Sequence, residues 1–256
     1  MISQAQIKLI KSLHLKKNRE QMNLFIAEGK KIVDELLNSD NIDVVHLFAS
    51  GNYFEDTPFT KVTEEEMKKI SALTTPPNIL AVCKIPAENT VIPNIQNELA
   101  LVLDDIRDPG NMGSIIRIAD WFGIGTIFCT SECVDAYNPK VVQASMGSIA
   151  RVKIDNKNLR TVLQESKDKR IPVYGAKLDG TNMLKEKLTA NGLLIIGNES
   201  NGISPELGKY ITHAIKIPSF SKDAIDPGSA PDGAESLNAA MATAILCAEF
   251  RREALK

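Results

Sequence analysis

Three short polar runs contain the residue types that could bind a polar ligand and move a proton. They read Asn111-Met112-Gly113-Ser114-Ile115-Ile116-Arg117, Gly197-Asn198-Glu199-Ser200-Asn201-Gly202 and Glu235-Ser236-Leu237-Asn238-Ala239-Ala240. Amides can orient a hydroxyl group, a carboxylate can accept its proton, and a guanidinium can grip a phosphate. Each run follows or adjoins an apolar, strand-like segment, at residues 101–103, 193–196 and 215–218. Because ligands of open α/β sheets bind where the strands end, this placement predicts one shared site.

Each of these polar residues also has a plain structural interpretation. Asn111 could be an ordinary N-cap, since asparagine is among the favoured capping residues. Ser236 could cap the last helix, with Asn238 exposed in its first turn. Arg117 could be a solvent-facing helix charge. A carboxylate next to an amide at the end of a strand, as at Glu199, is better explained by a binding role.

Sequence motifs of several other enzyme classes are missing. The segment Gly123-Ile124-Gly125 follows a helical pattern and precedes a strand, which reverses the order of a dinucleotide-binding fingerprint. The chain has no G-x-x-x-x-G-K-[ST] and no G-x-S-x-G motif. Its 3 histidines are scattered and its 4 cysteines form no C-x-x-C pair, so we expect neither a disulfide framework nor a metal site. The residues alone therefore predict an α/β protein with a polar ligand crevice.

Charge and hydropathy limit the possible partners and location. The net charge is −2, but residues 1–31 hold seven basic and two acidic side chains, or +5. Such a segment could meet phosphates, or it could be a solvated helix face. No apolar stretch reaches the roughly 18 residues of a membrane helix, and the N-terminus lacks a signal-peptide core. We therefore expect a cytoplasmic protein with no membrane partner.

Two domains are predicted from the order of strand and helix patterns. Strand, helix, strand, helix and strand patterns follow each other from residue 24 to 83, which predicts a small α/β unit. The looser stretch 86–97 reads as a linker, so we place the domains at 1–95 and 96–256. The second domain begins with a strand at 99–103 and alternates strands and helices up to a last helix expected near 236–250. This alternation predicts a mostly parallel sheet with helices on both faces.

The apolar residues of the last helix form a stripe of small and large side chains. They are Leu237, Ala240, Met241, Ala244, Ile245 and Ala248. Core packing is the default use of such a stripe, and a helix-to-helix dimer contact is the second.

Taken together and in this order, the motifs also carry a family resemblance. Asn111-x-Gly113-x-x-x-Arg117, Gly197-Asn198-Glu199-x-x-Gly202 and Ile217-Pro218 followed by Glu235-Ser236-Leu237-Asn238 resemble the three signature motifs of the SpoU (TrmH-like) branch of the SPOUT RNA methyltransferases. The resemblance covers residues 99–253. Segments 25–31 and 75–82 are similar to the N-terminal RNA-binding domain of rRNA-modifying members.

This resemblance implies a fold, an activity and an assembly. The implied activity is transfer of a methyl group from S-adenosylmethionine to a ribose 2′-hydroxyl of structured RNA, with rRNA favoured over tRNA. The implied assembly is a homodimer whose catalytic domain carries a C-terminal trefoil knot, a rare feature among folds.

The resemblance also implies roles for individual residues. Cofactor contacts would come from Leu178, Gly197, Ile217 and Leu237. The residues around the reacting ribose would be Asn111, Arg117, Glu199, Ser236 and Asn238. Since a guanidinium stays protonated in proteins, we expect Arg117 to hold an RNA phosphate and to stabilise the developing alkoxide. Glu199 or a water molecule would then accept the proton.

Two rival functions and one departure from the family pattern remain. A catalytically silent RNA-binding protein could share the fold, and a small-molecule α/β enzyme could use the crevice for a nucleotide. The family usually has a short link where this chain has the Asp- and Pro-containing segment 219–233. We expect that insertion to be a lid or a disordered loop.

Overall fold

The computed structural model describes residues 2–51, 57–86, 94–156, 158–220 and 236–254. Most of the insertion at 219–233, predicted to be a lid or a disordered loop, lies outside these residues. The chain divides into two compact units. The first contains residues up to 88 together with 112–117 and 134–151, and the second contains the remainder. The predicted domain boundary near residue 95 stays a prediction.

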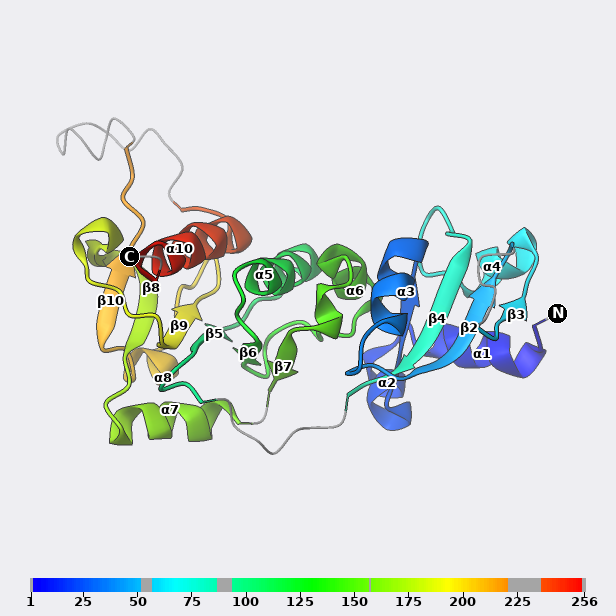
Figure 1. The fold of residues 1–256 in the computed structure, drawn as a ribbon, viewed down its shortest axis with the longest axis horizontal. Coiled ribbons are helices and arrows are strands. Elements are labelled where there is room, and N and C mark those ends of the chain that lie inside the picture. The colour runs from blue at the N-terminus through cyan, green and yellow to red at the C-terminus, as the bar shows by residue number, and fades with distance from the viewer. Residues whose placement is uncertain (1, 52–56, 87–93, 157, 221–235, 255–256) are drawn as a thin grey trace. The chain divides into compact units, whose positions relative to one another are not determined.

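The first unit is built on a four-stranded mixed sheet (Figure 1). Its elements are α1 (Gln4–Ser12), α2 (Lys16–Met22), β1 (Leu24–Glu28), α3 (Lys30–Leu37), β2 (Val44–Ala49), β3 (Thr60–Lys61), α4 (Glu64–Ile70) and β4 (Ile79–Lys84), with α6 (Pro139–Ser145) and η1 (Ser148–Ala150) added from later in the chain. The strand order is β1-β4-β2-β3, and β4 pairs antiparallel with both β1 and β2. The predicted small α/β unit is therefore confirmed.

The second unit is built on a six-stranded sheet in the order β10-β8-β9-β5-β6-β7. Its elements are β5 (Leu99–Leu103), α5 (Pro109–Trp121, shared with the first unit), β6 (Thr126–Cys129), β7 (Lys153–Asp155), α7 (Leu159–Asp168), β8 (Val173–Asn182), η2 (Met183–Lys185), β9 (Gly192–Ile196), α8 (Pro205–Gly208), β10 (His213–Lys216) and α10 (Ala239–Ala254). Every strand pair described in this sheet is parallel. The mostly parallel α/β sheet predicted from the sequence is confirmed.

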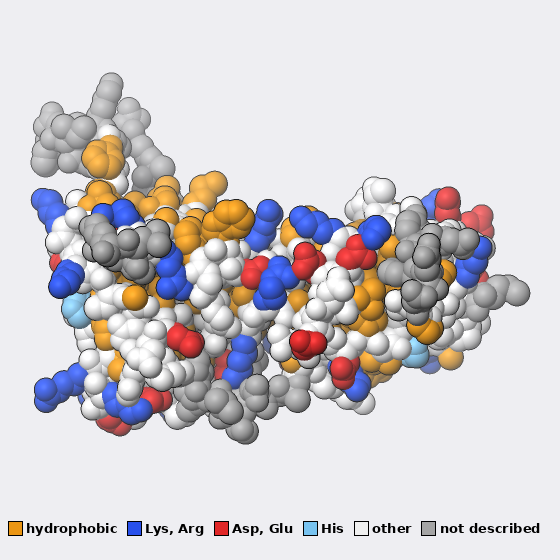
Figure 2. Space-filling view, viewed as in Figure 1, with side chains coloured by type: hydrophobic (Ala, Val, Ile, Leu, Met, Phe, Trp, Pro, Cys, Tyr) orange, Lys and Arg blue, Asp and Glu red, His pale blue; other side chains and the backbone are white. Residues whose placement is uncertain are grey.

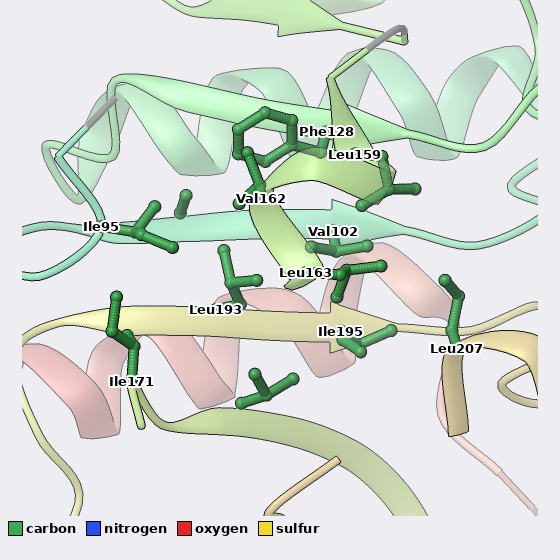
Figure 3. Close-up of a cluster of buried hydrophobic side chains, with 12 residues drawn as sticks. Ile95, Val102, Phe128, Leu159, Val162, Leu163, Ile171, Leu193, Ile195 and Leu207 are labelled. Carbon is green, nitrogen blue, oxygen red and sulfur yellow. The ribbon is translucent and has the colours of Figure 1, made fainter. Parts of the chain in front are cut away.

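Helices cover both faces of this sheet. On one face, α7 packs its apolar side chains on the central strands, and Figure 3 shows Val162 and Leu163 over Val102. Neighbouring residues of a strand point to opposite faces. Accordingly, Val173 of β8 joins the α7 side, whereas the ring of Tyr174 meets Phe250 of α10 with centroids 4.9 Å apart. The strands are held between two apolar layers, which makes their ends a rigid support.

The last helix differs from its predicted form in two ways. It begins at Ala239, with Asn238 as the cap, so Ser236 lies before the helix and does not cap it. Core packing was the default expectation for the apolar stripe, and it is wrong for the larger side chains. Met241 and Ile245 are 63% and 39% exposed, while Leu246 and Phe250 on another face of α10 are buried.

A trefoil knot requires the chain to pass through a loop of itself. The path from β10 to α10 runs through residues 221–235, which the structure does not describe. The knot stays a prediction. No helix among the described residues is both long enough and apolar enough to cross a membrane.

Candidate active site

The parallel strands of the second unit end close in sequence to several of the predicted site residues. Gly197 directly follows β9, Ile217 directly follows β10, and the turn Asp104–Asp108 joins β5 to α5. Since β5, β9, β8 and β10 are parallel neighbours, these ends share one edge of the sheet. This edge is where ligands of open α/β sheets bind.

Asn111, Glu199 and Asn238 form one hydrogen-bonded group, which we call the amide–carboxylate cluster. The Nδ2 of Asn111 donates to Oε1 of Glu199 at 2.9 Å, and the Nδ2 of Asn238 donates to Oδ1 of Asn111 at 2.8 Å. The backbone N–H of Ala239 donates to the same Glu199 Oε1, also at 2.9 Å. Three of the predicted site residues, far apart in sequence, are thus in direct contact.

Two helix starts hold the amides of the cluster. The cap of α5 is Asp108, whose carboxylate accepts the N–H of Asn111 at 2.7 Å. The N-cap interpretation of Asn111 is therefore wrong, and its side chain is left for Glu199 and Asn238. Asn238 itself caps α10, because its Oδ1 accepts the N–H groups of Ala240 and Met241 at 2.9 and 3.3 Å.

A tight turn after β9 presents Glu199. Asn198 and Gly202 exchange two backbone hydrogen bonds of 3.0 and 2.9 Å across this turn. A Cβ atom on Gly197 would lie 2.3 Å from the carbonyl carbon of Gly202, so only glycine fits there. Both hydrogen bonds described for the Glu199 carboxylate use Oε1. Its Oε2 has no partner among the described residues, and Glu199 is exposed.

Arg117 and Ser236 do not join the cluster. Arg117 is exposed on α5, and no hydrogen bond or ion pair to it occurs within the described part of the chain. Ser236 is exposed two residues before the α10 cap. Both side chains are accessible to a ligand, and their predicted roles stay predictions.

Of the four predicted cofactor residues, Gly197 and Ile217 directly follow strands, Leu178 lies within β8, and Leu237 precedes α10. Ala214 pairs with Gly175 and Ile215 pairs with Thr181, so residues 176–180 of β8 leave the pairing with β10. Leu178, on this excursion, is 74% exposed, and Leu237 is 43% exposed. The cofactor roles predicted for these four residues stay predictions. Within the described residues, no cluster of His, Cys, Asp or Glu could hold a metal ion.

The residues that support the cluster were not predicted from the sequence. Asn198 donates from its Nδ2 to the backbone oxygen of Asp105 at 2.9 Å. Asp105 has a φ of 57°, a left-handed conformation that aspartate tolerates better than most residues. An Asp-Asp pair directly after a buried strand was the available signal. The hydrogen bonds of Asp105 are made with residues about 25 and 90 positions away in the chain, and the local sequence pattern does not identify such partners.

Beside this turn lies Cys133, a buried thiol whose pKa is lowered in the folded protein. A hydrogen bond from Cys129 is the main cause that lowers the pKa of Cys133 to about 7, with help from the N–H of Ile106 and from Thr130. Burial acts in the opposite direction. Buried Cys129 has a pKa well above its usual value for the complementary reason.

Comparison with known proteins places both units among RNA-modifying proteins. A profile described as the SpoU rRNA Methylase family matches residues 98–248, and one described as the MRM3-like substrate binding domain matches residues 4–81. The chain is 29% identical over 252 residues to the Bacillus subtilis (strain 168) protein named 23S rRNA (guanosine(2553)-2'-O)-methyltransferase RlmP, with 96% of each chain covered.

Solved structures agree with this assignment over nearly the full length. A TrmH-family structure from Porphyromonas gingivalis has a TM-score of 0.84 and 38% identity, covering 98% of this chain and 99% of that one. An AdoMet-bound rRNA methyltransferase from Sinorhizobium meliloti has a TM-score of 0.82 and 26% identity, covering 100% of this chain and 97% of that one.

Proposed function

Because the chain belongs to the SpoU rRNA methylase family, we propose that it methylates a ribose 2′-hydroxyl of ribosomal RNA, with S-adenosylmethionine as methyl donor. The observation that carries the proposal is the amide–carboxylate cluster at the ligand edge of the sheet. The full-length similarity to the RlmP protein favours rRNA over tRNA as substrate. A cytoplasmic location is part of the proposal, since rRNA is the proposed substrate.

The residues of the strand ends fit the methyl donor. When bound, S-adenosylmethionine supplies an electrophilic methyl group. Gly197 and Ile217 would contact it through their backbones, and Leu178 and Leu237 through exposed apolar side chains. That the AdoMet-bound Sinorhizobium protein shares this fold supports the same donor here.

The cluster would orient the ribose hydroxyl and take up its proton. The Oε2 of Glu199 is accessible, while Oε1 is fixed by Asn111 and by the N–H of Ala239. A carboxylate held at one oxygen keeps the other in a defined direction, which is what general base catalysis requires. Asn238 fixes the amide of Asn111 and so keeps that amide from turning away. Glu199, directly or through a water molecule, would accept the proton as the hydroxyl attacks the methyl carbon.

Arg117 and Ser236 would bind the RNA beside the hydroxyl. The exposed guanidinium of Arg117 is suited to a bidentate contact with a phosphate, and its permanent charge would stabilise the developing alkoxide. The exposed hydroxyl of Ser236 can donate to or accept from the ribose.

A homodimer is part of the proposal, supported by an exposed apolar surface of the second unit. Met241 and Ile245, four residues apart on α10, are exposed together with Leu237 just before the helix, and we call these three residues the α10 apolar face. Figure 2 shows hydrophobic side chains gathered over α10. Trp121, at the end of α5, is 85% exposed, and Arg251 of α10 binds the carbonyl oxygen of the adjacent Phe122 at 2.6 Å. Contiguous exposed apolar surface of this kind marks protein interfaces, and a second copy of the chain is the proposed partner.

The proposal is tested by transfer of labelled methyl groups. Purified protein is incubated with tritiated S-adenosylmethionine and with unmethylated rRNA or tRNA, beside an Asn111→Ala/Glu199→Ala double variant. We expect label in rRNA and none with the variant. Label only in tRNA would overturn the rRNA assignment, and equal label with the variant would overturn the assignment of the cluster.

The rival of a silent RNA-binding protein is tested in the same samples. Such a protein would bind rRNA in a filter assay but would bind no S-adenosylmethionine and transfer no label. Calorimetric binding of S-adenosylmethionine together with transfer excludes it. Label incorporated into a small metabolite rather than RNA would favour the small-molecule enzyme.

A further inference from the structure

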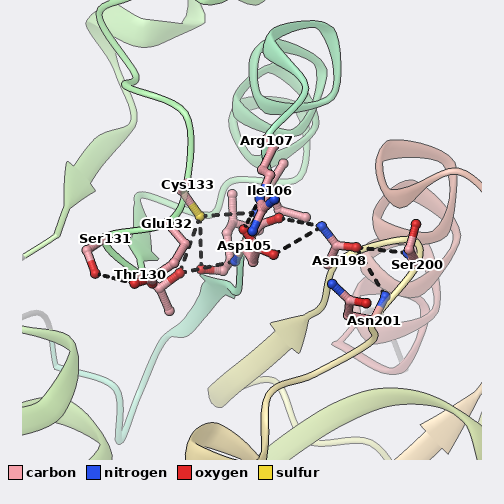
Figure 4. A network of polar contacts seen from close by, with 11 residues as sticks. Asp105, Ile106, Arg107, Thr130, Ser131, Glu132, Cys133, Asn198, Ser200 and Asn201 are labelled. Carbon is pink, nitrogen blue, oxygen red and sulfur yellow. Dashed lines mark hydrogen bonds and ion pairs between the residues drawn. The ribbon is translucent and has the colours of Figure 1, made fainter.

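The turn between β5 and α5 is fixed by two side chains that belong to none of the three motifs. The N–H of Asp105 donates to Oγ1 of Thr130 at 3.1 Å, and the next N–H, that of Ile106, donates to Sγ of Cys133 at 3.3 Å (Figure 4). Thr130 follows β6 directly, and its own N–H binds Leu103 of β5 at 3.0 Å. Two adjacent backbone donors of the turn are thus satisfied by the neighbouring strand's loop. This pairing holds Asp105 at its positive φ of 57°.

The same turn forms hydrogen bonds with both ends of the segment that carries Glu199. At one end, the Nδ2 of Asn198 donates to the backbone oxygen of Asp105 at 2.9 Å and lies 3.3 Å from its Oδ2. At the other end, the N–H of Ser204 donates to Oδ2 of the buried Asp104 at 2.7 Å. The segment 197–204 is therefore anchored to the β5–α5 turn, rather than only to its own strand.

Asn198 connects the β5–α5 turn to the backbone around Glu199. Its Oδ1 accepts the N–H groups of Ser200 and Asn201 at 2.8 and 3.1 Å, which closes the turn around residue 199. A change in the direction of the Asn198 amide would move both donors, and with them the carboxylate of Glu199. Figure 4 shows the continuous path from Thr130 through Asp105 to Asn198 and its turn.

We infer that Thr130 and Asp105 are positioning residues, which set the direction of the Glu199 carboxylate through Asn198. This inference rests on the proposed function, in which Glu199 accepts the proton. The exposed ion pair from Arg107 to Asp105, at 2.6 Å, adds little to the positioning, because solvent screens it. The hydroxyl of Thr130 is the critical acceptor, since it alone faces the N–H of Asp105 in the described structure.

Two substitutions of Thr130 distinguish the effect of losing the hydroxyl acceptor from the effect of changing the shape of the side chain. Thr130→Val keeps the volume and removes the acceptor, whereas Thr130→Ser keeps the acceptor. We expect Thr130→Val to lower kcat on rRNA about 10- to 100-fold, as small displacements at a reacting centre do. We expect the Kd for S-adenosylmethionine to stay within about twofold, and Thr130→Ser to behave like the wild type. Rates are compared well below each variant's melting temperature.

Amide hydrogen exchange gives a readout that does not depend on activity. Peptides covering 197–204 should exchange faster in Thr130→Val than in the wild type or in Thr130→Ser, while peptides of α7 stay unchanged. Wild-type kcat and exchange in Thr130→Val, or equal losses in Thr130→Val and Thr130→Ser, would overturn the inference. If the wild type methylates no RNA, the proposed function fails, but the exchange comparison still decides whether Thr130 orders this segment.

A second pair of variants, at Asp105, tests the inference if Thr130→Val does not fold. Asp105→Asn tolerates a positive φ and keeps a side-chain acceptor, whereas Asp105→Val disfavours that conformation. The inference predicts slow turnover and fast exchange at 197–204 only for Asp105→Val. Equal behaviour of the two variants would overturn it.

Discussion

The carboxylate of Glu199 differs from an ordinary surface carboxylate in that one of its oxygens is already occupied. Its Oε1 accepts from Asn111 and from Ala239, at 2.9 Å in both cases. Among the described residues only Oε1 has hydrogen-bond partners, so a substitution that keeps an acceptor there but cannot take up a proton tests the proposed structural and chemical roles separately.

Glu199→Gln is that substitution. Glutamine can keep an acceptor oxygen toward Asn111 and Ala239 but cannot accept a proton. We expect kcat to fall by about 10²- to 10⁴-fold, the usual contribution of a general base, with little change in melting temperature or in the Kd for S-adenosylmethionine. Single-turnover methylation of rRNA measures the rate. A variant within twofold of the wild type would show that Glu199 is not the proton acceptor.

The thiol of Cys133 should make the stability of the folded protein depend on pH in a defined direction. Its folded-state pKa is lowered from 9.0 to about 7, so between these values the unfolded chain binds the proton that the folded chain has released. The resulting stabilisation is fully present above pH 9 and is lost as the pH falls to 7. Relative to Cys133→Ser, the wild type should gain up to about 3 kcal/mol between pH 7 and 9. Thermal melts of both proteins across this range measure the gain, and a constant difference would show that the pKa of Cys133 is not lowered in the folded protein.

At the scale of single residues, the motifs predicted three of the side chains that meet, but not the residues that hold them. Asn111, Glu199 and Asn238 could be named because residue type and strand ends point to one edge. Asp105 and Thr130 could not, because their roles depend on a positive φ and on a partner from another strand. Gly197 is required because the backbone of Gly202 fills the space of its Cβ, a packing fact that no local pattern contains.

Among the elements, the start of α10 has two functions. Asn238 caps the helix through Oδ1 and fixes Asn111 through Nδ2. The cap explains why the helix begins at Ala239 rather than near residue 236, where the apolar pattern begins. One side chain therefore couples the stability of α10 to the geometry of the cluster.

Two substitutions at Asn238 uncouple these functions. Asn238→Ala removes both, and we expect a loss of about 1 kcal/mol from the missing cap together with a large loss of kcat. Asn238→Asp keeps the cap, because aspartate is an equally good N-cap, but it loses the donor to Asn111. We expect a wild-type melting temperature and a low kcat for Asn238→Asp. Wild-type turnover of Asn238→Asp would show that the contact to Asn111 is dispensable.

Most strands and helices could be predicted, because buried parallel strands are short apolar runs and the helices show clear periodicity. The excursion 176–180 within β8 could not. Its cause is the shifted pairing with β10, in which Gly180 lies so close to Ile215 that a Cβ would come within 2.6 Å of that backbone. Long-range pairing of this kind leaves no periodic signal in either strand.

For the whole molecule, the basic N-terminal segment is only partly available to RNA. Arg19 is 1% exposed and pairs with Asp135 inside the first unit. Lys16 and Lys30 pair with acidic neighbours one helical turn away. The basic residues of this segment that are exposed and could contact phosphates are Lys8, Lys11, Lys17 and Lys31. Counting charges could not separate these groups, because burial and pairing depend on the fold.

The proposed homodimer gives a prediction at this scale. Wild-type protein should have a solution mass of twice the 28.0-kDa chain, measured by light scattering after gel filtration. Met241→Lys/Ile245→Lys places charges on the α10 apolar face and should give a folded protein of single-chain mass. Val45→Lys, at a side chain that is 40% exposed in the first unit, is the matched control and should remain dimeric. A monomeric wild type, or a dimeric double variant, would contradict this use of the α10 apolar face.

In the proposed function, the amide–carboxylate cluster promotes methylation of a ribose oxygen in rRNA. The most direct measurement is alkaline hydrolysis of rRNA labelled by the wild type with tritiated S-adenosylmethionine, followed by nucleoside analysis of the product. A 2′-O-methyl group blocks cleavage of the adjacent linkage, so the account predicts label in alkali-resistant dinucleotides and a 2′-O-methylnucleoside after full digestion. It also predicts no such product from the Glu199→Gln variant. Label in alkali-sensitive mononucleotides carrying a methylated base would contradict the account.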